Sequence, residues 1–323
     1  MPPRPLTPLL ALLLLFTSAA LADPPKPPGL TGPVGPRAAE PKRVRTLLID
    51  KPGVYEDYLV DAQFADVDAV RIKADNVTLR RCEIRNGKRD AIEVYARDVL
   101  IEDCKIHHFL GGSFKDQKDA HGITGQPTRL TIRNCEIGLI SGDCLQFDPG
   151  RKPWTDVVVE SCRFYAAPLP ADAAGFKKGE SPGENAVDTK QSADNPRSKI
   201  TLRDCVFEGF SKNGFIGNRA ALNLKNHVEV IVERCVFDDN EIAVRARGPG
   251  KKKNPLGGAL VDLADCAFYR SPVAIRAEDD IARLNLTRPR FDASIEKKLH
   301  TVGGKPPGLK IEDERPADPR ERK

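Results

Sequence analysis

The sequence has 323 residues, with 51 Lys and Arg against 46 Asp and Glu, which gives a formal net charge of +5 at pH 7. That small basic excess permits an anionic partner without requiring one, and we expect no nucleic-acid partner. After residue 22 no stretch approaches the roughly 18 consecutive apolar residues of a transmembrane helix, so we expect no membrane span.

The N-terminal 45 residues are expected to lie outside the folded domain. Residues 1–22 combine a single Arg with a long apolar run and end in small residues, which is the pattern of a secretory signal peptide. Pro and Gly dominate the next stretch, so we expect an extended linker over 23–45. The signal predicts a secreted protein, either extracellular or periplasmic.

Internal repeats dominate residues 46–302, which we expect to form one domain. A pattern aliphatic-x-aliphatic-x-x-Cys-x-Ile/Phe occurs as VTLRRCEI (77–84), VLIEDCKI (99–106), LTIRNCEI (130–137), VVVESCRF (157–164), ITLRDCVF (200–207), VIVERCVF (230–237) and VDLADCAF (261–268), and LNLTRPRF (284–291) is a copy with Pro for Cys. A second, shorter pattern precedes each copy: AVRIK (69–73), AIEVY (91–95), GITGQ (122–126), CLQFD (144–148), AVDTK (186–190), ALNLK (221–225), AVRAR (243–247) and AIRAE (274–278). Alternation of apolar and polar residues predicts three short strands in each unit.

Units of this size cannot bury their apolar faces alone, so they must stack into a continuous core. The repeats resemble a right-handed parallel β-helix of the pectate-lyase-like type over about residues 47 to 300. We therefore predict an all-β solenoid of about eight coils, and a monomer. A leucine-rich repeat is the alternative fold, but its Leu spacing and its Asn position are missing.

Seven of the eight cysteines occupy one position of one repeated strand: Cys82, Cys104, Cys135, Cys162, Cys205, Cys235 and Cys266. In a parallel β-helix they should stack as a buried, reduced column of small side chains. A disulfide framework is the alternative for a secreted protein, although a large stacked core needs no such staples. Zinc is disfavoured because no Cys-x-x-Cys pair occurs.

Alternation along the second pattern predicts three columns of side chains that point outward from the helix. The first is small throughout and should form a flat floor: Ala69, Ala91, Gly122, Cys144, Ala186, Ala221, Ala243 and Ala274. The second contains Gln146, Asp188, Asn223 and Arg245, and the third contains Asp148, Lys190, Lys225 and Arg247. The resulting groove would be acidic at one end and basic at the other, which suits a bridging cation and a polyanion. A solvated polar face is the alternative interpretation.

A further column precedes these strands: Asp68, Asp90, His121, Asp143 and Asn185. Asp and Asn at a repeated bend usually cap the turn backbone, so Asp68 and Asp90 are expected to be structural. His121 should stack on Asp143, either as a structural pair or as a group that contacts substrate.

Two other segments depart from the repeat. The insert 166–182 is too long for an ordinary bend, so we predict a loop that leaves the helix beside the groove. The tail 303–323 is charged, rich in Pro and poor in apolar residues, and it is expected to be disordered.

The stretch ENAVD (184–188) resembles the Asp-Asp-Gly-Trp-Asp rung that binds calcium in one family of β-helical pectate lyases. The resemblance implies Ca²⁺ ligands at Glu184, Asn185 and Asp188, with Asp143 or Asp148 contributed by the previous rung. The position of that family's catalytic Lys is held here by Asn223, so Lys225 or Lys190 would have to serve as the base.

The sequence thus leads to the hypothesis of eliminative cleavage of an acidic, uronate-containing polysaccharide with a divalent cation. Lys225 is preferred as the base because the neighbouring cations Lys190, Arg245 and Arg247 favour the neutral amine that a base needs. Arg245 would assist the reaction, while Asn223, Arg247, Gln146 and His121 would contact the substrate.

Two other functions remain open from the sequence. A non-catalytic polysaccharide-binding or cell-surface protein is the main alternative, because fold does not fix function. A glycoside hydrolase related to polygalacturonases is less favoured, since of that family's motifs only RIK occurs, at 71–73 on the first rung.

Overall fold

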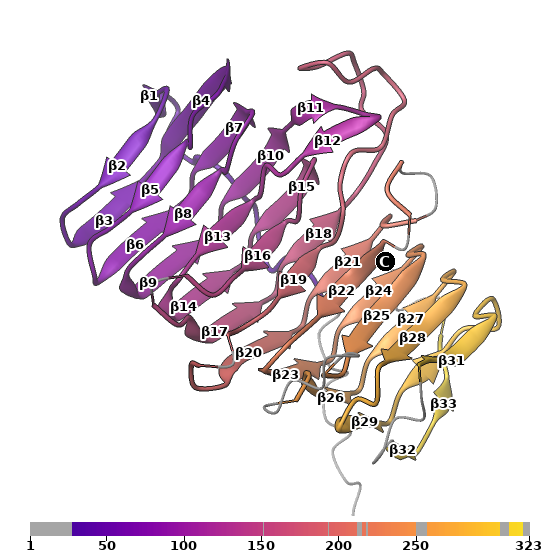
Figure 1. The fold of residues 1–323 in the computed structure, drawn as a ribbon. Helices are drawn as coiled ribbons and strands as arrows, with labels where there is room; N and C mark the ends of the chain where they lie inside the picture. Colours follow the sequence, from indigo (N-terminus) through magenta and orange to yellow (C-terminus); the bar gives the residue numbers. More distant parts are fainter. Residues whose placement is uncertain are drawn as a thin grey trace, which may run out of the picture.

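The protein is represented by a computed structural model that describes residues 28–150, 152–192, 194–211, 215–217, 219–249, 257–303 and 310–318. The predicted signal peptide lies outside these residues. The described chain winds into a right-handed parallel β-helix with three long sheets, as predicted (Figure 1). In this part of the chain there is no helix that could span a membrane.

Each coil contributes one strand to each of three parallel sheets, called A, B and C in the order in which the chain visits them. Sheet A consists of β1 (Lys42–Val44), β4 (Tyr58–Ala65), β7 (Glu83–Gly87), β10 (Lys105–Phe109), β15 (Glu136–Ile140), β18 (Arg163–Tyr165), β21 (Val206–Glu208), β24 (Val236–Asp238), β27 (Ala267–Tyr269), β30 (Arg290–Phe291) and β33 (Arg315–Pro316). Sheet B consists of β2 (Leu47–Ile49), β5 (Val70–Ile72), β8 (Ile92–Val94), β13 (Ile123–Gly125), β16 (Leu145–Phe147), β19 (Val187–Thr189), β22 (Ala220–Leu224), β25 (Ile242–Arg247), β28 (Val273–Glu278) and β31 (Lys297–Val302). Sheet C consists of β3 (Gly53–Glu56), β6 (Val77–Arg80), β9 (Arg97–Glu102), β14 (Thr128–Arg133), β17 (Thr155–Glu160), β20 (Ser198–Arg203), β23 (Val228–Glu233), β26 (Leu260–Ala264), β29 (Arg283–Thr287) and β32 (Lys310–Glu312).

The number of coils exceeds the prediction. The eight copies of the second pattern form β5 to β28 of sheet B, but the described residues add β2 before them and β31 after them. These end coils carry no ladder cysteine, so the sequence pattern did not reveal them.

The interior is built from columns of like side chains. Phe164, Phe207, Phe237, Phe268 and Phe291 stack with successive ring centroids 5.1 Å apart. The seven ladder cysteines are buried and free, so the predicted column is confirmed. Each follows a residue with positive φ, such as Asn134 (φ 46°) before Cys135, where the chain turns sharply from sheet C into sheet A. A small side chain therefore fits the inside of this corner.

The small column before the sheet B strands does not form an exposed floor, so this prediction was wrong. Ala91, Ala186, Ala221, Ala243 and Ala274 are fully buried. A Cβ added at Gly122 of the same column would lie 2.3 Å from the Cys144 carbonyl oxygen. The bend thus holds this position close to the backbone of the next coil. The residues here are small because of that close contact, and not because they form a flat outer surface.

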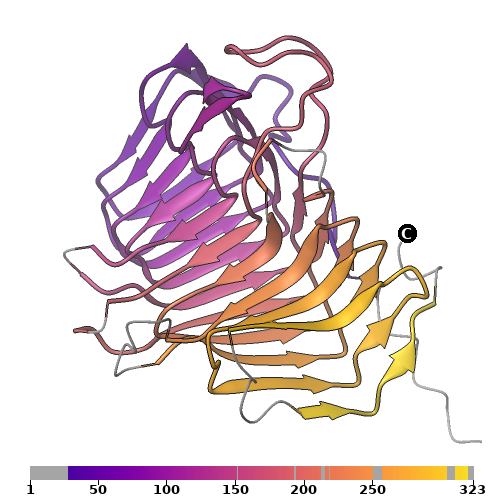
Figure 2. The same ribbon diagram turned by 45° about the vertical axis from the view of Figure 1, so that its right-hand side comes forward.

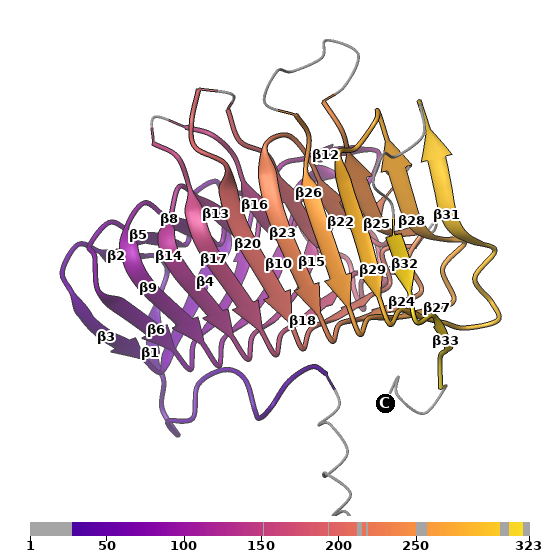
Figure 3. The same cartoon turned by 90° about the horizontal axis from the view of Figure 1, so that it is seen from below.

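Both terminal segments are more ordered than the sequence suggested. Residues 28–38, expected as linker, run along the C-to-A corner of the helix (Figure 3). We call this segment the strap: Gly29 donates to the Asp204 carbonyl, Thr31 to Asn134 Oδ1 and Gly35 to the Asp103 carbonyl. Within the tail, expected to be disordered, β32 and β33 extend two sheets because their backbone groups pair with β29 and β30.

The long insert leaves the solenoid between sheets A and B, beside a hairpin formed by β11 (Gly111–Ser113) and β12 (Asp116–Lys118) (Figures 1 and 2). Leu169 and Phe176 of the insert are buried against Leu110 and Leu139. The insert returns to the helix where Gly183 donates to Gln117 Oε1 at 3.0 Å, immediately before β19. It therefore borders the strand starts of sheet B, as predicted.

Candidate functional site

The outer face of sheet B carries several of the predicted site residues in register. Gln146, Asp188, Asn223, Arg245 and Arg276 face outward on adjacent strands from β16 to β28. Adjacent strands lie about 4.8 Å apart, so this column runs along the helix axis. The adjacent outward column contains Asp148, Lys190, Lys225 and Arg247.

Two aspartates in this face each hold a lysine with one carboxylate oxygen. Lys190 Nζ lies 2.8 Å from Asp148 Oδ2, and Lys225 Nζ forms a salt bridge with Asp188 Oδ2. Burial is the largest single effect on the pKa of Lys190 and acts to lower it, but the hydrogen bond with Asp148 and the charges of Asp148 and Asp188 together outweigh burial, so the pKa is raised. The salt-bridge partner of the Lys225 amine is thus Asp188, an acid that the argument from the neighbouring cations Lys190, Arg245 and Arg247 did not include.

The other oxygen of each aspartate is unpaired. Among the described residues, Asp148 Oδ1, Asp188 Oδ1 and Asn223 Oδ1 are buried without a hydrogen-bond partner. Buried oxygens of this kind are rare because each one costs desolvation free energy, so they are candidates for contact with water, an ion or a ligand. The three are hard oxygen donors, one immediately after β16 and one each on β19 and β22, and donors of this kind fit a Ca²⁺-like cation.

The column that precedes these strands is a backbone-capping ladder. Asp90 Oδ1 accepts from the His121 N–H at 2.8 Å, His121 Nδ1 accepts from the Asp143 N–H at 3.1 Å, and Asp143 Oδ1 accepts from the Asn185 N–H at 2.9 Å. Asn185 Oδ1 in turn accepts from the Ala220 N–H at 3.1 Å. The structural interpretation of Asp90 is therefore supported. His121 does contact Asp143, through the backbone N–H of that residue. The Asp143 and Asn185 oxygens used here are less available to a metal than the sequence implied.

Three acids crowd together at the start of β19. Burial, followed by repulsion from Asp188 and Glu184, raises the pKa of Asp143 well above its usual value. Burial and the Asp188 charge likewise raise the pKa of Glu184, and burial raises that of Asp188 in spite of Lys225. The cluster therefore favours either bound protons or a cation.

A second acidic group lies toward the N-terminal end of sheet B. Carboxylate oxygens of Asp68, Asp90 and Glu93 come within 4.8 Å of one another, the one such group of three found among the described residues. Arg71 bridges Asp68 and Glu93, with 2.5 Å to each, and Arg89 lies 3.1 Å from Asp68. Two arginines thus already balance most of this negative charge.

Three supporting residues were not singled out from the sequence. Arg219 is fully buried, donates to the Pro182 carbonyl at 3.1 Å, and has its pKa lowered to about 10 by burial. Trp154 is buried and donates to the Lys190 carbonyl at 2.9 Å, which fixes the end of β19. Glu278 binds three arginines on β25 and β28. The positions of Arg219 and Trp154 in the sequence do not reveal their structural roles, because the carbonyl groups that their side chains bind are distant in sequence.

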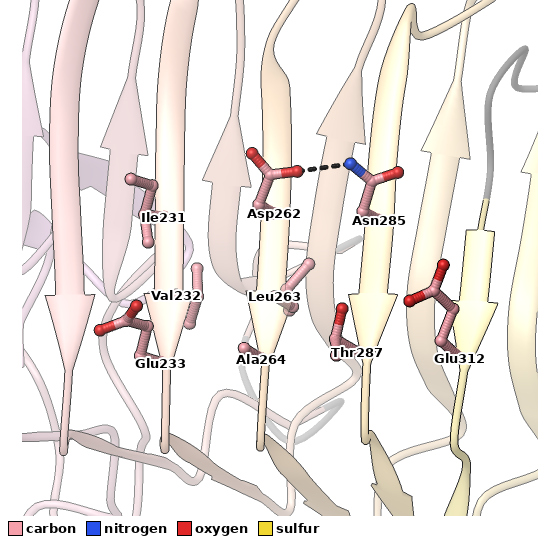
Figure 4. Close-up of a pocket in the computed structure, with 9 residues that line it drawn as sticks. All are labelled: Ile231, Val232, Glu233, Asp262, Leu263, Ala264, Asn285, Thr287 and Glu312. Atoms are coloured by element: carbon pink, nitrogen blue, oxygen red, sulfur yellow. Dashed lines mark hydrogen bonds between the residues drawn. The ribbon is translucent and has the colours of Figure 1, made fainter.

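A hollow of about 270 Å³ lies on another face. Figure 4 shows it on the outer side of sheet C, across β23, β26, β29 and β32, where Asn285 donates to Asp262 Oδ1 at 2.6 Å. Ala264 lies between the longer Glu233 and Thr287 in one register row, which leaves the depression. None of the predicted site residues lines it.

Comparison with known proteins concerns the fold. Residues 68–167 match the family model described as "Right handed beta helix region", which is less than half of the chain. No curated protein sequence is significantly similar to this chain. The crystal structure of pectate lyase Pel9A is similar with a TM-score of 0.52 at 12% identity, over 84% of this chain and 69% of that one. An alginate lyase from Paenibacillus sp. str. FPU-7 has a TM-score of 0.44 at 11% identity, over 85% of this chain and 89% of that one. The fold of this chain is therefore a right-handed parallel β-helix of the pectate-lyase-like kind.

Proposed function

We propose that this protein is a secreted, carbohydrate-active β-helix protein that cleaves an acidic, uronate-containing polysaccharide by β-elimination with a divalent cation. The observation that carries the proposal is the set of unpaired buried oxygens on Asp148, Asp188 and Asn223 beside two lysines. Pectate lyase Pel9A, whose fold is similar, supports the substrate class by analogy.

Asp148, Asp188 and Asn223 would hold the cation, with Glu184 as a further ligand. A divalent cation would neutralise the substrate carboxylate and so make the alpha proton acidic enough to remove. Gln146, Arg245 and Arg247 would bind the chain on either side. Asp143, Asn185 and His121 would hold the strand starts in place through the capping ladder.

Lys225 remains the proposed base, with one added requirement. In its salt bridge with Asp188 Oδ2, Lys225 is an ammonium, so it would have to leave that carboxylate and release a proton to solvent before Nζ could accept one from the substrate. Engagement of the Asp188 carboxylate with a cation would remove the partner that holds the ammonium form and so favour both changes next to the substrate. Lys190 is the reserve candidate, but it is held by Asp148 in the same way.

Incubation with pectate, alginate and glycosaminoglycans, in calcium or in EDTA, tests the reaction through the ultraviolet absorbance of the unsaturated product. Lys225→Ala should lower turnover about 100-fold or more, the usual contribution of a general base, while calcium binding persists. Asp188→Asn should weaken calcium binding and turnover together.

Lys298→Ala is the matched control, since Lys298 is an exposed lysine paired with Glu314 at the far end of the helix. Wild-type product formation by Lys225→Ala would reassign the base. The salt bridge that occupies Lys225 favours one alternative, a non-catalytic polysaccharide-binding protein. Polyuronate binding without unsaturated product from any substrate would establish that alternative.

A further inference from the structure

The N-terminal end of sheet B carries a hollow that the proposed function does not use. It has a volume of about 400 Å³ and lies over β2 and β5, the first two strands of the sheet (Figure 1). Leu48, which is 56% exposed, gives it an apolar floor, and Arg71, Lys73 and Arg89 lie around it. The hollow is on the same outer face as the proposed cation site, so a polymer that follows this face can extend into it.

The three cations of the hollow differ in their partners. Arg71 lies 2.5 Å from a carboxylate oxygen of Asp68 and 2.5 Å from one of Glu93. Arg89 lies 3.1 Å from Asp68. Lys73 is exposed and forms no ion pair within the part of the chain that the structure describes. Of the three, Lys73 is therefore the cation that can bind an anionic group without leaving an acid of the protein.

An exposed aromatic ring, Tyr95, lies beside this lysine. Tyr95 directly follows β8 and is 43% exposed. The residues immediately before Lys73, Tyr95 and Asp148 pair in register through β5, β8, β13 and β16, so these three side chains share one column. Lys73 and Tyr95 are neighbours in the column, about 4.8 Å apart at Cα. The ring thus stands between the hollow and the cation site.

The Tyr95 ring is held in place through its hydroxyl group, which donates to Glu93 Oε1 at 3.1 Å. Glu93 is only 7% exposed and is itself bound by Arg71, so the acceptor is fixed. Burial, followed by the Glu93 charge, raises the pKa of Tyr95 to about 12, so the hydroxyl stays a donor at neutral pH. Because Glu93 lies two residues earlier on the same face, the ring leans back along the strand and over the sheet.

An ordered ring beside an amine matches the chemistry of a uronate unit. A pyranose ring has an apolar side made of C–H groups, which can pack against an aromatic ring, and its hydroxyl groups remain in water. The carboxylate of the uronate can pair with an ammonium group. A side chain that is already fixed loses little conformational entropy when the sugar binds.

We propose that Tyr95, Lys73 and the adjoining hollow form a distal subsite for an acidic polysaccharide, in which one sugar ring stacks on Tyr95 with its carboxylate toward Lys73. The next unit of the chain occupies the hollow over Leu48. Glu93 and Arg71 are positioning residues that fix the ring. The polysaccharide character of the ligand rests on the proposed function, but the subsite does not require that the chain be cleaved.

The distance from the cation site limits the length of the ligand. Tyr95 lies two strands before Asp148, about 10 Å along the axis. Two linked sugar rings cover roughly this separation. A chain that is held at the cation site, at Tyr95 and in the hollow must therefore be longer than a disaccharide.

Proton NMR in EDTA, where elimination is not expected, tests the stacking contact. The probes are hexasaccharides of galacturonate, of mannuronate and of heparin. Sugar C–H protons that lie over an aromatic ring shift upfield through its ring current, so at least one probe should show this shift with the wild type. Tyr95→Leu should abolish the shift and weaken binding of that probe about tenfold, whereas Tyr95→Phe, which keeps the ring, should retain the shift.

Lys73→Ala tests the second part of the subsite. It should weaken binding of the same probe about threefold at low ionic strength while the upfield shift persists, because an exposed charge contributes little and is screened by salt. Lys73→Arg should restore the affinity. Ile231→Ala is the control, since Ile231 is an exposed apolar residue of the hollow on sheet C, and its binding and shift should equal those of the wild type.

An unchanged upfield shift in Tyr95→Leu, or no shift with any of the three probes in the wild type, would overturn the stacking role. Equal binding by Lys73→Ala at low ionic strength would overturn the role of Lys73. The two proposals fail separately: an upfield shift without unsaturated product in calcium overturns only the lyase function. Cleavage with wild-type KM by Tyr95→Leu overturns only the subsite, because loss of a binding contact raises KM and leaves kcat unchanged.

Discussion

Asp143 is the most enclosed acid of the candidate site, only 1% exposed, and its Oδ1 accepts two hydrogen bonds from Asn185. Its raised pKa means that the folded protein holds a proton which the unfolded chain releases near the ordinary value of 3.8. By linkage, the folded state then loses stability as pH rises from that ordinary value through the raised one. Glu184 and Asp188 contribute in the same direction.

We therefore expect the free energy of unfolding in EDTA to fall as pH rises from about 4 toward neutrality, in the range where an unperturbed carboxyl ionises first. Denaturant unfolding across this pH range measures the slope. Asp143→Asn should flatten it, because the amide cannot ionise. Glu314→Gln, at an exposed pair with Lys298 far from this cluster, should leave it unchanged. An equal slope in wild type and Asp143→Asn would contradict the assignment.

At the scale of elements, the sequence predicted the strands well because each repeat obeys a local rule. Register then follows from stacking like upon like, as with the cysteine and phenylalanine columns. The alternation of inward and outward side chains placed the small column on the outer surface, and this was wrong. The rule holds for extended strands, whereas the column lies in a bend, where Ala186 turns inward.

The sequence predicted which residues of the candidate site share a column, but it did not predict the contacts between their side chains. Lys225 and Asp188 do lie on one face, but their salt bridge depends on rotamers that spacing does not determine. Glu278 ended a recognised repeat, yet its role appears only when arginines from two strands meet on it. Arg219 reaches Pro182 across 37 residues, which no local pattern encodes.

The insert 166–182 docks as an element through a small apolar cluster separate from the main core. Phe176→Ala should cost about 3 kcal/mol or more at that cluster, as for other buried aromatic truncations. Because Phe176 contacts none of the interior columns, the loss should appear as local opening. Limited proteolysis should then cut within the insert, while the main thermal transition stays within a few degrees of the wild type. A large drop in that transition would mean that the insert supports the whole solenoid.

At the scale of the whole molecule, the strap joins coils that are far apart along the axis. Five of its backbone N–H groups, at Gly29, Thr31, Gly32, Gly35 and Arg37, bond to the helix, and the Arg37 side chain binds Asp103 at 2.7 Å. Deletion of residues 1–38 should therefore destabilise the protein by about 3–6 kcal/mol, counting roughly 0.5–1 kcal/mol for each hydrogen bond.

Thermal unfolding checks this value, and deletion of residues 1–27 is the control because it keeps all of these contacts. Equal melting temperatures of the two truncated proteins would show that the strap does not contribute to stability.

The strap also sets an order of events during synthesis. Gly29 needs the carbonyl of Asp204, which lies 175 residues later in the chain. Coils can stack one after another through short-range contacts as the polypeptide lengthens, but this partner does not exist until most of the solenoid has been made. The segment that is translated early therefore docks late, and the long loop that it closes is completed only when the coil that carries Asp204 is in place.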